Sequence, residues 1–339
     1  MLHTLHPQTP KFWKVTRYFT RPQSSTPPLH HQGTQVYQAP HKAKLLAQQF
    51  ERAHHLTQSL GSRHHTTSVS RFVTKFFCND TPQTPPLQLT NPYEIKRKIL
   101  SLKTRSAPGH DNISTTVLRH LSNKALKHFT DLFNHLLLKG HFPAIWKRGK
   151  VIPILKPRKP SSDPASYRPI SLRSTLGKLF ERIVADRLKS FTDHQKLLPQ
   201  EQFGFRKRHS TVSQLARITD YVTHGYNLHK RTGMVLLDLE KAYNTIWIQG
   251  LLYKLITLNL PTYLLFIIKA FLEDRSFTVH LNKASSTHKF PSAGLPQGAV
   301  LSTTLFTLFI SDIPHPQTQL WHCMRTTPPS WHNPGGQIL

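Results

Sequence analysis

Acidic residues and cysteines are scarce in this sequence of 339 residues. Only 16 Asp and Glu oppose 45 Lys and Arg, so the formal net charge at pH 7 is +29. The two cysteines, Cys78 and Cys323, exclude a disulfide-rich scaffold and a cysteine-rich zinc site. A chain with this charge repels itself unless a polyanion neutralises it, and we therefore expect nucleic acid as the partner.

Long apolar runs and targeting signals are also missing. The first residues, MLHTLHPQTPKFWKV, lack the apolar stretch of a secretory signal peptide. Runs such as 263–268 are too short to cross a bilayer, so we expect no membrane-spanning segment. A membrane surface is a weaker alternative partner, because no basic amphipathic helix stands out. The 23 histidines form no HExxH motif, and we interpret them as composition bias.

The composition changes at about residue 91. Before it, Pro, Gln, Thr, Ser and His are abundant, and only Glu51 and Asp80 are acidic. Because only 39–60 carries a helical pattern there, we predict that residues 1–91 form a basic, largely irregular linker. Helical and strand patterns alternate from residue 92 onward, which predicts an α+β fold over 92–320.

Apolar spacing gives the expected elements of this α+β region. Helices are expected over 93–102, 114–139, 176–188 and 300–310. Strands are expected over 151–155, 234–239, 277–281 and 288–290, the last two forming a hairpin. We find no internal repeat, and mixed elements with a hairpin favour one α+β unit.

Asp238 interrupts the apolar strand expected over 234–239. An ionised carboxylate in such a run is costly to bury unless it meets a cation, a hydrogen-bond network or a metal ion. The alternative is an Asp that ends the strand and caps the following turn. The string that follows, LLDLEKAYNTIW, places a small residue and an aromatic after the carboxylate, as a polymerase palm requires.

Four sequence blocks resemble those of one polymerase family, in the same order. LLDLEKAYNTIW (236–247) resembles the first catalytic motif of reverse transcriptases from non-LTR, LINE-like retrotransposons, most closely the jockey group. The other blocks are SLKTRSAPGHDNIS (101–114), GKVIPILKPRKPSSDPASYRPISL (149–172) with QFGFRKRHST (202–211), and AGLPQGAVLSTTLF (293–306). The resemblance covers about 92–320. It implies a right-hand polymerase, of which this chain would hold the fingers and part of the palm.

The resemblance implies roles for residues of the palm. Asp238 would bind both catalytic metals, and the backbone carbonyl of Leu239 would bind one of them. Tyr243 matches the aromatic gate that rejects a ribose 2′-hydroxyl, with plain core packing as the alternative. Gln297 and Gly298 match the block that lies against the incoming nucleotide, where glycine lets the backbone approach closely.

The resemblance also implies roles for basic residues of the fingers. Lys156 and Arg168 match residues near the nucleotide phosphates, which suits a point charge and a guanidinium fork. A solvated basic face is the alternative reading. Arg206 matches a template contact, and packing within the fingers explains it equally well. Asn244, where Asp is commoner, and Thr303, where Pro is usual, depart from the family pattern.

The implied reaction is RNA-directed DNA polymerisation by two-metal nucleotidyl transfer with Mg²⁺. RNA template, DNA primer and dNTPs would be the partners. Family members assemble in the cytoplasm and integrate in the nucleus, so both compartments are expected. The reaction needs more than one carboxylate, and the family supplies a second pair from a later Tyr-Ala-Asp-Asp hairpin.

That acidic pair is missing where the family pattern places it. After LFISDIP (308–314) the chain continues without a sheet or helix pattern, and 321–339 contains no Asp or Glu. The codons of WHCMRTT (321–327), read two bases later, encode Ala-Leu, then Tyr or His, then Ala and two residues that both permit Asp. We therefore interpret 321–339 as an out-of-frame tail and predict that this chain, lacking the acidic pair and a thumb, has no polymerase activity.

Two other functions compete with the enzyme. The second hypothesis is a noncatalytic nucleic-acid-binding remnant, based on the +29 charge and on the Lys and Arg residues between 147 and 159. The third is an inert translated relic. Steep salt dependence of binding without primer extension would indicate the binder, and proteolysis with circular dichroism would separate the binder from the relic.

Overall fold

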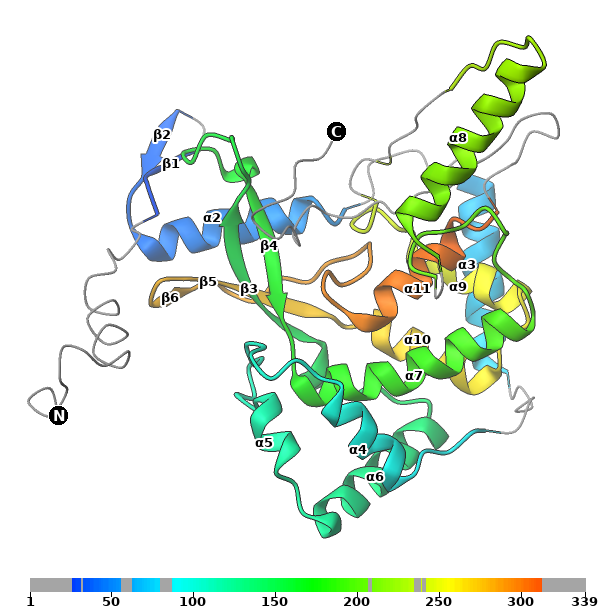
Figure 1. Cartoon of the computed structure of the whole chain (residues 1–339). Helices are drawn as coiled ribbons and strands as arrows, with labels where there is room; N and C mark the ends of the chain where they lie inside the picture. Colours follow the sequence, from blue (N-terminus) through cyan, green and yellow to red (C-terminus); the bar gives the residue numbers. More distant parts are fainter. Residues whose placement is uncertain are drawn as a thin grey trace, which may run out of the picture.

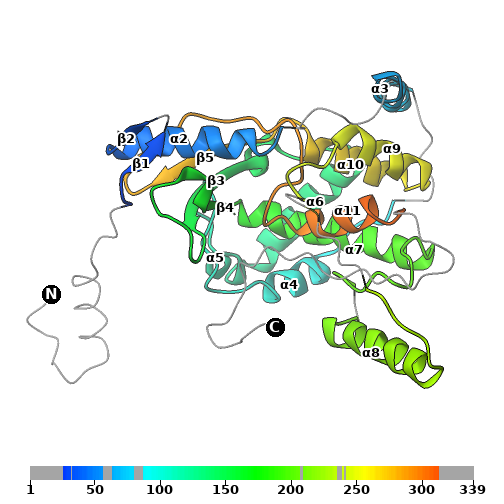
Figure 2. The ribbon, with the colours of Figure 1, turned by 90° about the horizontal axis from the view of Figure 1, so that it is seen from above.

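The computed structural model describes residues 26–31, 33–55, 63–79, 87–206, 209–234, 239 and 242–312. A small mixed sheet lies beside a larger set of helices, and helix α8 projects away from both in two perpendicular views (Figures 1 and 2). Within these ranges we find no helix long and apolar enough to span a bilayer. The expected α+β class is confirmed.

The main sheet has the strand order β4-β3-β5-β6. Its strands are β3 (Arg148–Leu155), β4 (Tyr167–Leu172), β5 (Ser276–Leu281) and β6 (Ala284–Ser285). β3 and β4 form an antiparallel hairpin in which Ile154 lies opposite Arg168. β3 and β5 are parallel, with Gly149 opposite Phe277. The parallel pair joins the β3–β4 hairpin to a strand from much later in the chain.

The strand predictions have mixed outcomes. The strands expected over 151–155 and 277–281 are confirmed as β3 and β5. The return strand of the hairpin is β6 rather than 288–290, because the backbone turns tightly at Asn282, which has a φ of 56°. Only an isolated bridge joins Lys289 to Phe277. The strand expected over 234–239 falls mostly outside the described residues, which resume only at Leu239 in this stretch.

Eight α-helices follow residue 91 in the described part of the chain. They are α4 (Pro92–Leu100), α5 (Thr115–Arg119), α6 (Asn123–Leu138), α7 (Thr175–His194), α8 (Thr211–Asn227), α9 (Ile248–Thr257), α10 (Thr262–Leu272) and α11 (Val300–Phe309). The helices expected over 93–102, 176–188 and 300–310 are confirmed as α4, α7 and α11. The helix expected over 114–139 is two helices, because Ser122 caps a new start by accepting a hydrogen bond from the Ala125 amide.

The largest hydrophobic core lies where α7 meets α10 and α11. Phe180 and Ile183 of α7 are fully buried, as are Leu264 and Ile267 of α10 and Leu305 of α11. α10 is apolar on nearly every side because it is buried in this core, where it packs on α9 and α6. α7 therefore lies within this core, where it packs on α11 and α4.

The segment before residue 92 is more ordered than its composition predicts. β1 (Leu29–His31) pairs with β2 (Thr34–Val36), followed by α2 (Ala39–Arg52) and α3 (Arg63–Cys78). α2 lies along β5 (Figure 2), and α3 packs on α9, where the Phe72 and Tyr253 rings are 5.2 Å apart. The expectation of a largely irregular linker is therefore corrected for these elements, since their apolar side chains find partners late in the chain.

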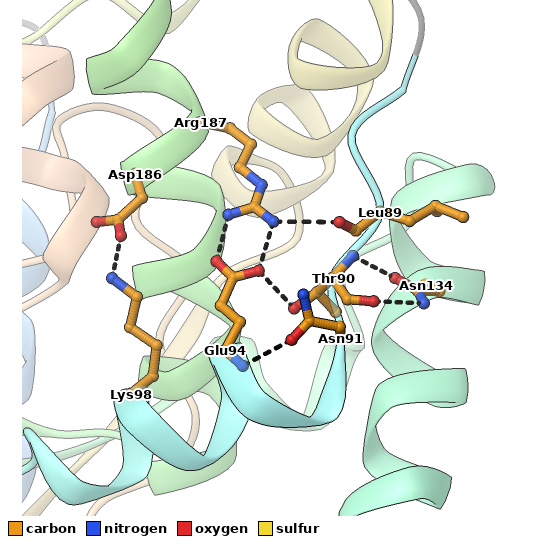
Figure 3. Close-up of polar contacts among 8 residues, drawn as sticks. All are labelled: Leu89, Thr90, Asn91, Glu94, Lys98, Asn134, Asp186 and Arg187. Carbon is orange, nitrogen blue, oxygen red and sulfur yellow. Dashed lines mark hydrogen bonds and ion pairs between the residues drawn. The ribbon is translucent and has the colours of Figure 1, made fainter.

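Helix α4 is fastened to α7 by charged side chains (Figure 3). The Arg187 guanidinium forms a fork on the Glu94 carboxylate, with Nη2 2.6 Å from Oε2. The Thr90 hydroxyl donates to the same carboxylate at 2.8 Å. Lys98, one turn later, pairs with Asp186. These contacts fix the start of the loop that follows α4.

Candidate active site

The two faces of the main sheet are in different environments. Val151 and Val279 point to one face and are buried against α2. Their neighbours point to the opposite face, because side chains alternate along a strand. There Ile154 is 47% exposed and Ile170 is 37% exposed. We call this second side the open face.

Lys156 and Arg168 lie together near the tip of the β3–β4 hairpin. Arg168 is half-buried on β4, directly opposite Ile154, and so belongs to the open face. Lys156 follows β3, and its ammonium donates to the Ala165 carbonyl at 2.8 Å. Its amide also donates to the Ser166 carbonyl, at 2.8 Å. The structure thus brings together the two basic residues expected near nucleotide phosphates, with Lys156 anchored on backbone.

The Tyr243 segment is hydrogen-bonded to the Gly-x-Pro-Gln-Gly block. The Leu295 amide donates to the Tyr243 carbonyl at 2.7 Å, and Gln297 Nε2 donates to Asn244 Oδ1 at 3.1 Å. Gly294 has a φ of 77°, and a Cβ there would lie 2.5 Å from the Asn244 carbonyl oxygen. Only glycine permits this approach. Asn244, the departure from the family pattern, thus serves as the acceptor for Gln297.

The Tyr243 ring packs against helix α11. It stacks on Phe306 with a centroid distance of 4.7 Å and an interplanar angle of 24°. This contact supplies the core packing named as the alternative to a gate. The gate role of Tyr243 stays a prediction.

Gly298 lies beside the β3–β4 hairpin. Its φ is 78°, and a Cβ there would lie 3.6 Å from the carbonyl oxygen of Ser171 on β4. Three of the four blocks therefore meet: the Tyr243 segment contacts the Gly-x-Pro-Gln-Gly block, and that block contacts β4.

A buried ion pair fixes the start of α11. Glu181 of α7 is fully buried and lies 2.7 Å from an Arg173 guanidinium nitrogen. Its other oxygen accepts from the Val300 amide at 2.7 Å, at the first residue of α11. A carboxylate at a helix N-terminus is electrostatically favourable. Sequence spacing alone did not identify Glu181, although an acidic residue within an amphipathic apolar helix is a signal of such a role.

A basic pocket lies on the α2 side of the sheet. Its lining includes Lys147, Arg173, Arg275, His54 and Gln297. Burial, and then the charge of Arg173, lower the pKa of Arg275 to about 10. Arg275 Nε donates to a backbone carbonyl at 2.8 Å. Lys156 and Arg168 are not among the lining residues, so the structure does not gather all the expected nucleotide contacts in one cavity.

The other expected site residues either lie away from these contacts or fall outside the residues that the structure describes. Arg206 donates to the Pro199 carbonyl at 3.0 Å, which fits local packing. Asp238, the expected catalytic and metal-binding residue, falls outside the described residues, and Leu239 next to it is exposed. Among the residues that the structure places, no three His, Cys, Asp or Glu side chains converge on a common point.

Comparison with known proteins resolves the family. Residues 154–326 match the model of the family described as reverse transcriptase (RNA-dependent DNA polymerase), which is about half of the chain. The chain belongs to this family. The family implied by the four blocks is therefore confirmed, although the block at 101–114 lies before the matched residues.

Curated relatives place the chain among non-LTR transposon proteins. It is 34% identical over 318 residues to the probable RNA-directed DNA polymerase from transposon X-element of Drosophila melanogaster, covering 92% of this chain and 34% of the relative. It is 36% identical over 247 residues to the RNA-directed DNA polymerase from mobile element jockey of the same species, covering 73% and 27%. The chain thus spans about a third or less of the length of these relatives.

Proposed function

We propose that this chain forms the fingers and part of the palm of an RNA-directed DNA polymerase from a jockey-like non-LTR retrotransposon. Its partners would be an RNA template, a DNA primer and dNTPs, in the cytoplasm, the nucleus or both. The observation that carries the proposal is the direct contact among three resembling blocks from separate parts of the sequence. Leu295 bonds to Tyr243, and Gly298 lies beside Ser171.

The proposed roles follow the positions of the side chains. Lys156 and Arg168, together near the hairpin tip, would hold the nucleotide phosphates; the ammonium acts as a point charge and the guanidinium as a two-pronged donor. Gln297, held by Asn244, would lie against the nucleotide, and Tyr243 would exclude the 2′-hydroxyl. Arg206 would contact the template.

Mg²⁺ is the proposed cofactor, with Asp238 and the Leu239 carbonyl as ligands. When bound, it would stabilise the negative charge that develops at the reacting phosphate. One carboxylate provides too few hard oxygen ligands for two ions. We therefore infer that these 339 residues do not extend a primer, and that residues 321–339 are an out-of-frame tail.

Resequencing the DNA and transcript across the codons for 308–339 tests the tail first. Primer extension with Mg²⁺ then tests the enzyme. We expect no extension by the chain as printed, extension when the region after 320 is translated in the frame that encodes Ala-Leu-Tyr-Ala-Asp-Asp, and loss of that activity in Asp238→Asn. Extension by the printed chain would contradict the inactivity. A restored protein that binds template but never extends would contradict the enzyme.

A noncatalytic nucleic-acid binder is the second candidate function. The open face favours it, because Lys150 and Arg168 lie there, Lys156 directly follows β3, and the other side of the sheet is covered by α2. Binding to phosphates should weaken steeply with salt. Salt-dependent binding by the printed chain without extension would support this function.

A further inference from the structure

The loop between α4 and α5 brings a histidine to the open face. This loop contains the block SLKTRSAPGHDNIS, and its Gly109 packs directly on the junction of β4 and α7. A Cβ at Gly109 would lie 2.5 Å from the Arg173 carbonyl carbon and from the Ser174 amide nitrogen, so no larger residue fits without backbone movement. The next residue, His110, is exposed and lies above β5. The glycine therefore fixes where His110 stands.

His110 meets a second histidine on β5. The His110 and His280 rings are 6.0 Å apart at an angle of 61°. His280 Nε2 lies 3.0 Å from the Thr278 hydroxyl, two residues earlier on the same strand face. Lys150 of β3 lies directly beside Thr278 in the parallel ladder. Three groups that carry or can acquire positive charge thus gather from a loop and two strands.

The charges around His280 are of one sign. Burial lowers the pKa of His280, and the charges of Lys150 and His110 lower it further. No carboxylate is among the groups that act on it within the described residues. Asp111, the nearest acidic residue in sequence, turns away: its Oδ1 accepts from the Ile113 amide at 3.2 Å, and its charge acts on Lys178. Among the residues that the structure places, no anion balances this cluster.

We propose that His110, Lys150 and His280 form a phosphate-binding site for the backbone of a bound nucleic acid, and that this site binds more tightly in acid solution. A phosphate beside both rings, on the solvent side of the pair, would favour their protonated forms, since a nearby opposite charge stabilises the charged state. Each protonated imidazole would then donate a charge-assisted hydrogen bond. The inference rests on the proposed nucleic-acid binding and adds a contact at the base of the hairpin, away from Lys156.

Fluorescence anisotropy with a labelled single-stranded RNA tests this site. Affinity is measured over a series of salt concentrations at about pH 5.5 and about pH 8, on either side of the ordinary histidine pKa. We expect the double variant His110→Gln, His280→Gln to reduce the slope of log K against log salt by about 1 at the lower pH. At the higher pH we expect it to match the wild type.

A matched control removes the same number of histidines elsewhere. The double variant His128→Gln, His135→Gln changes two exposed positions on α6 and should keep the wild-type slope at both pH values. Circular dichroism checks that each variant folds. If both double variants behave alike while RNA still binds, the site is overturned and the proposed function stands.

A second probe distinguishes a site for the phosphates of an RNA backbone from a site for the phosphates of a free nucleotide. Binding of labelled dATP is measured for the same variants at the lower pH. The inference expects the His110 and His280 substitutions to weaken RNA binding and leave dATP binding unchanged. Weaker dATP binding with unchanged RNA binding would overturn it in favour of a nucleotide site. Failure of the wild type to bind RNA at either pH would overturn both the site and the proposed nucleic-acid binding.

Discussion

The two faces of the β4-β3-β5-β6 sheet use the same strands for different purposes. On the side that faces α2, Val151 and Val279 are buried and join a compact apolar cluster. On the open face, Ile154 and Ile170 remain exposed next to basic side chains. Alternation along β3 and β4 therefore separates a face that stabilises the fold from a face suited to binding. A single-residue shift of register would exchange the two.

The largest effect on folding is expected on the covered face. Phe50 of α2 is 4% exposed and belongs to the cluster with Val151. Phe50→Ala should lower the free energy of unfolding by about 3–5 kcal/mol, because it leaves a cavity at the contact between helix and sheet. Ile154→Ala, on the open face, should cost less than about 1 kcal/mol. Urea denaturation of both variants measures the contrast, and equal losses would show that the two faces do not differ as described.

The next effect concerns the support of the loop that carries His110. Burial tends to raise the pKa of Glu94, but hydrogen bonds from Arg187 and Thr90 and the charges of Arg187 and Lys98 outweigh it, so the pKa lies below its ordinary 4.5. Glu94→Gln should cost about 1.5–3 kcal/mol near neutral pH, as expected for a lost hydrogen bond to a charged group.

The sign of the pH dependence follows from that lowered pKa. The stabilisation by ionised Glu94 is present above about pH 4.5 and is lost as the pH falls through the lower, folded-state pKa. The stability difference between wild type and Glu94→Gln should therefore shrink below pH 4.5. Urea denaturation across this range measures it. A difference that stays constant down to strongly acid pH would show that the carboxylate charge is not its source.

A smaller effect is expected where the Gly-x-Pro-Gln-Gly block meets β4. Gly298→Ala places a residue with a Cβ at a φ of 78° but meets only an ordinary contact with the Ser171 carbonyl. We expect a loss of about 1–2 kcal/mol from the left-handed backbone alone. Gly294→Ala should cost more, because its Cβ also overlaps the Asn244 carbonyl. Thermal denaturation of both variants should preserve this order.

The least effect on folding is expected from charges on the open face. Lys156→Gln with Arg168→Gln should leave stability nearly unchanged and reduce the salt slope of RNA binding by about 2, one for each lost phosphate contact. The control, Lys44→Gln with Arg52→Gln, removes the same charge from exposed positions of α2. If both double variants reduce the slope equally, net charge alone determines binding, and the two faces are equivalent for RNA.

Periodicity identified the elements whose apolar stripe is clear. α7 and α11 were expected nearly as they occur, because their buried residues recur at helical spacing. The sequence of α3 shows little apolar periodicity, since only Val69 and Val73 of its residues are buried. α8 was not anticipated for a related reason, as only Gln214 is buried along it.

Only part of the candidate site could be predicted from the sequence. The resemblance selected Lys156, Arg168, Tyr243 and Gln297, but their contacts depend on tertiary structure. No spacing rule predicts that Gln297 bonds to Asn244, or that His110 meets His280 across a large stretch of chain. Both pairs join segments that are distant in the sequence, and periodicity specifies neither these contacts nor the parallel pairing of β3 with β5 that places Lys150 beside Thr278.

The contact between α2 and the sheet has a practical consequence for dissecting this protein. The His54 carbonyl, just after α2, accepts a hydrogen bond from the Ala293 amide at 3.0 Å, immediately before the Gly-x-Pro-Gln-Gly block. A fragment that starts at residue 92, or at residue 154 where the family match starts inside β3, would lose this support. A start at residue 92 would also expose Val151 and Val279 to solvent, whereas a start at residue 154 would remove Val151 altogether and expose Val279. Either exposed surface would invite aggregation. The boundary drawn by homology is therefore a poor place to cut the chain for expression.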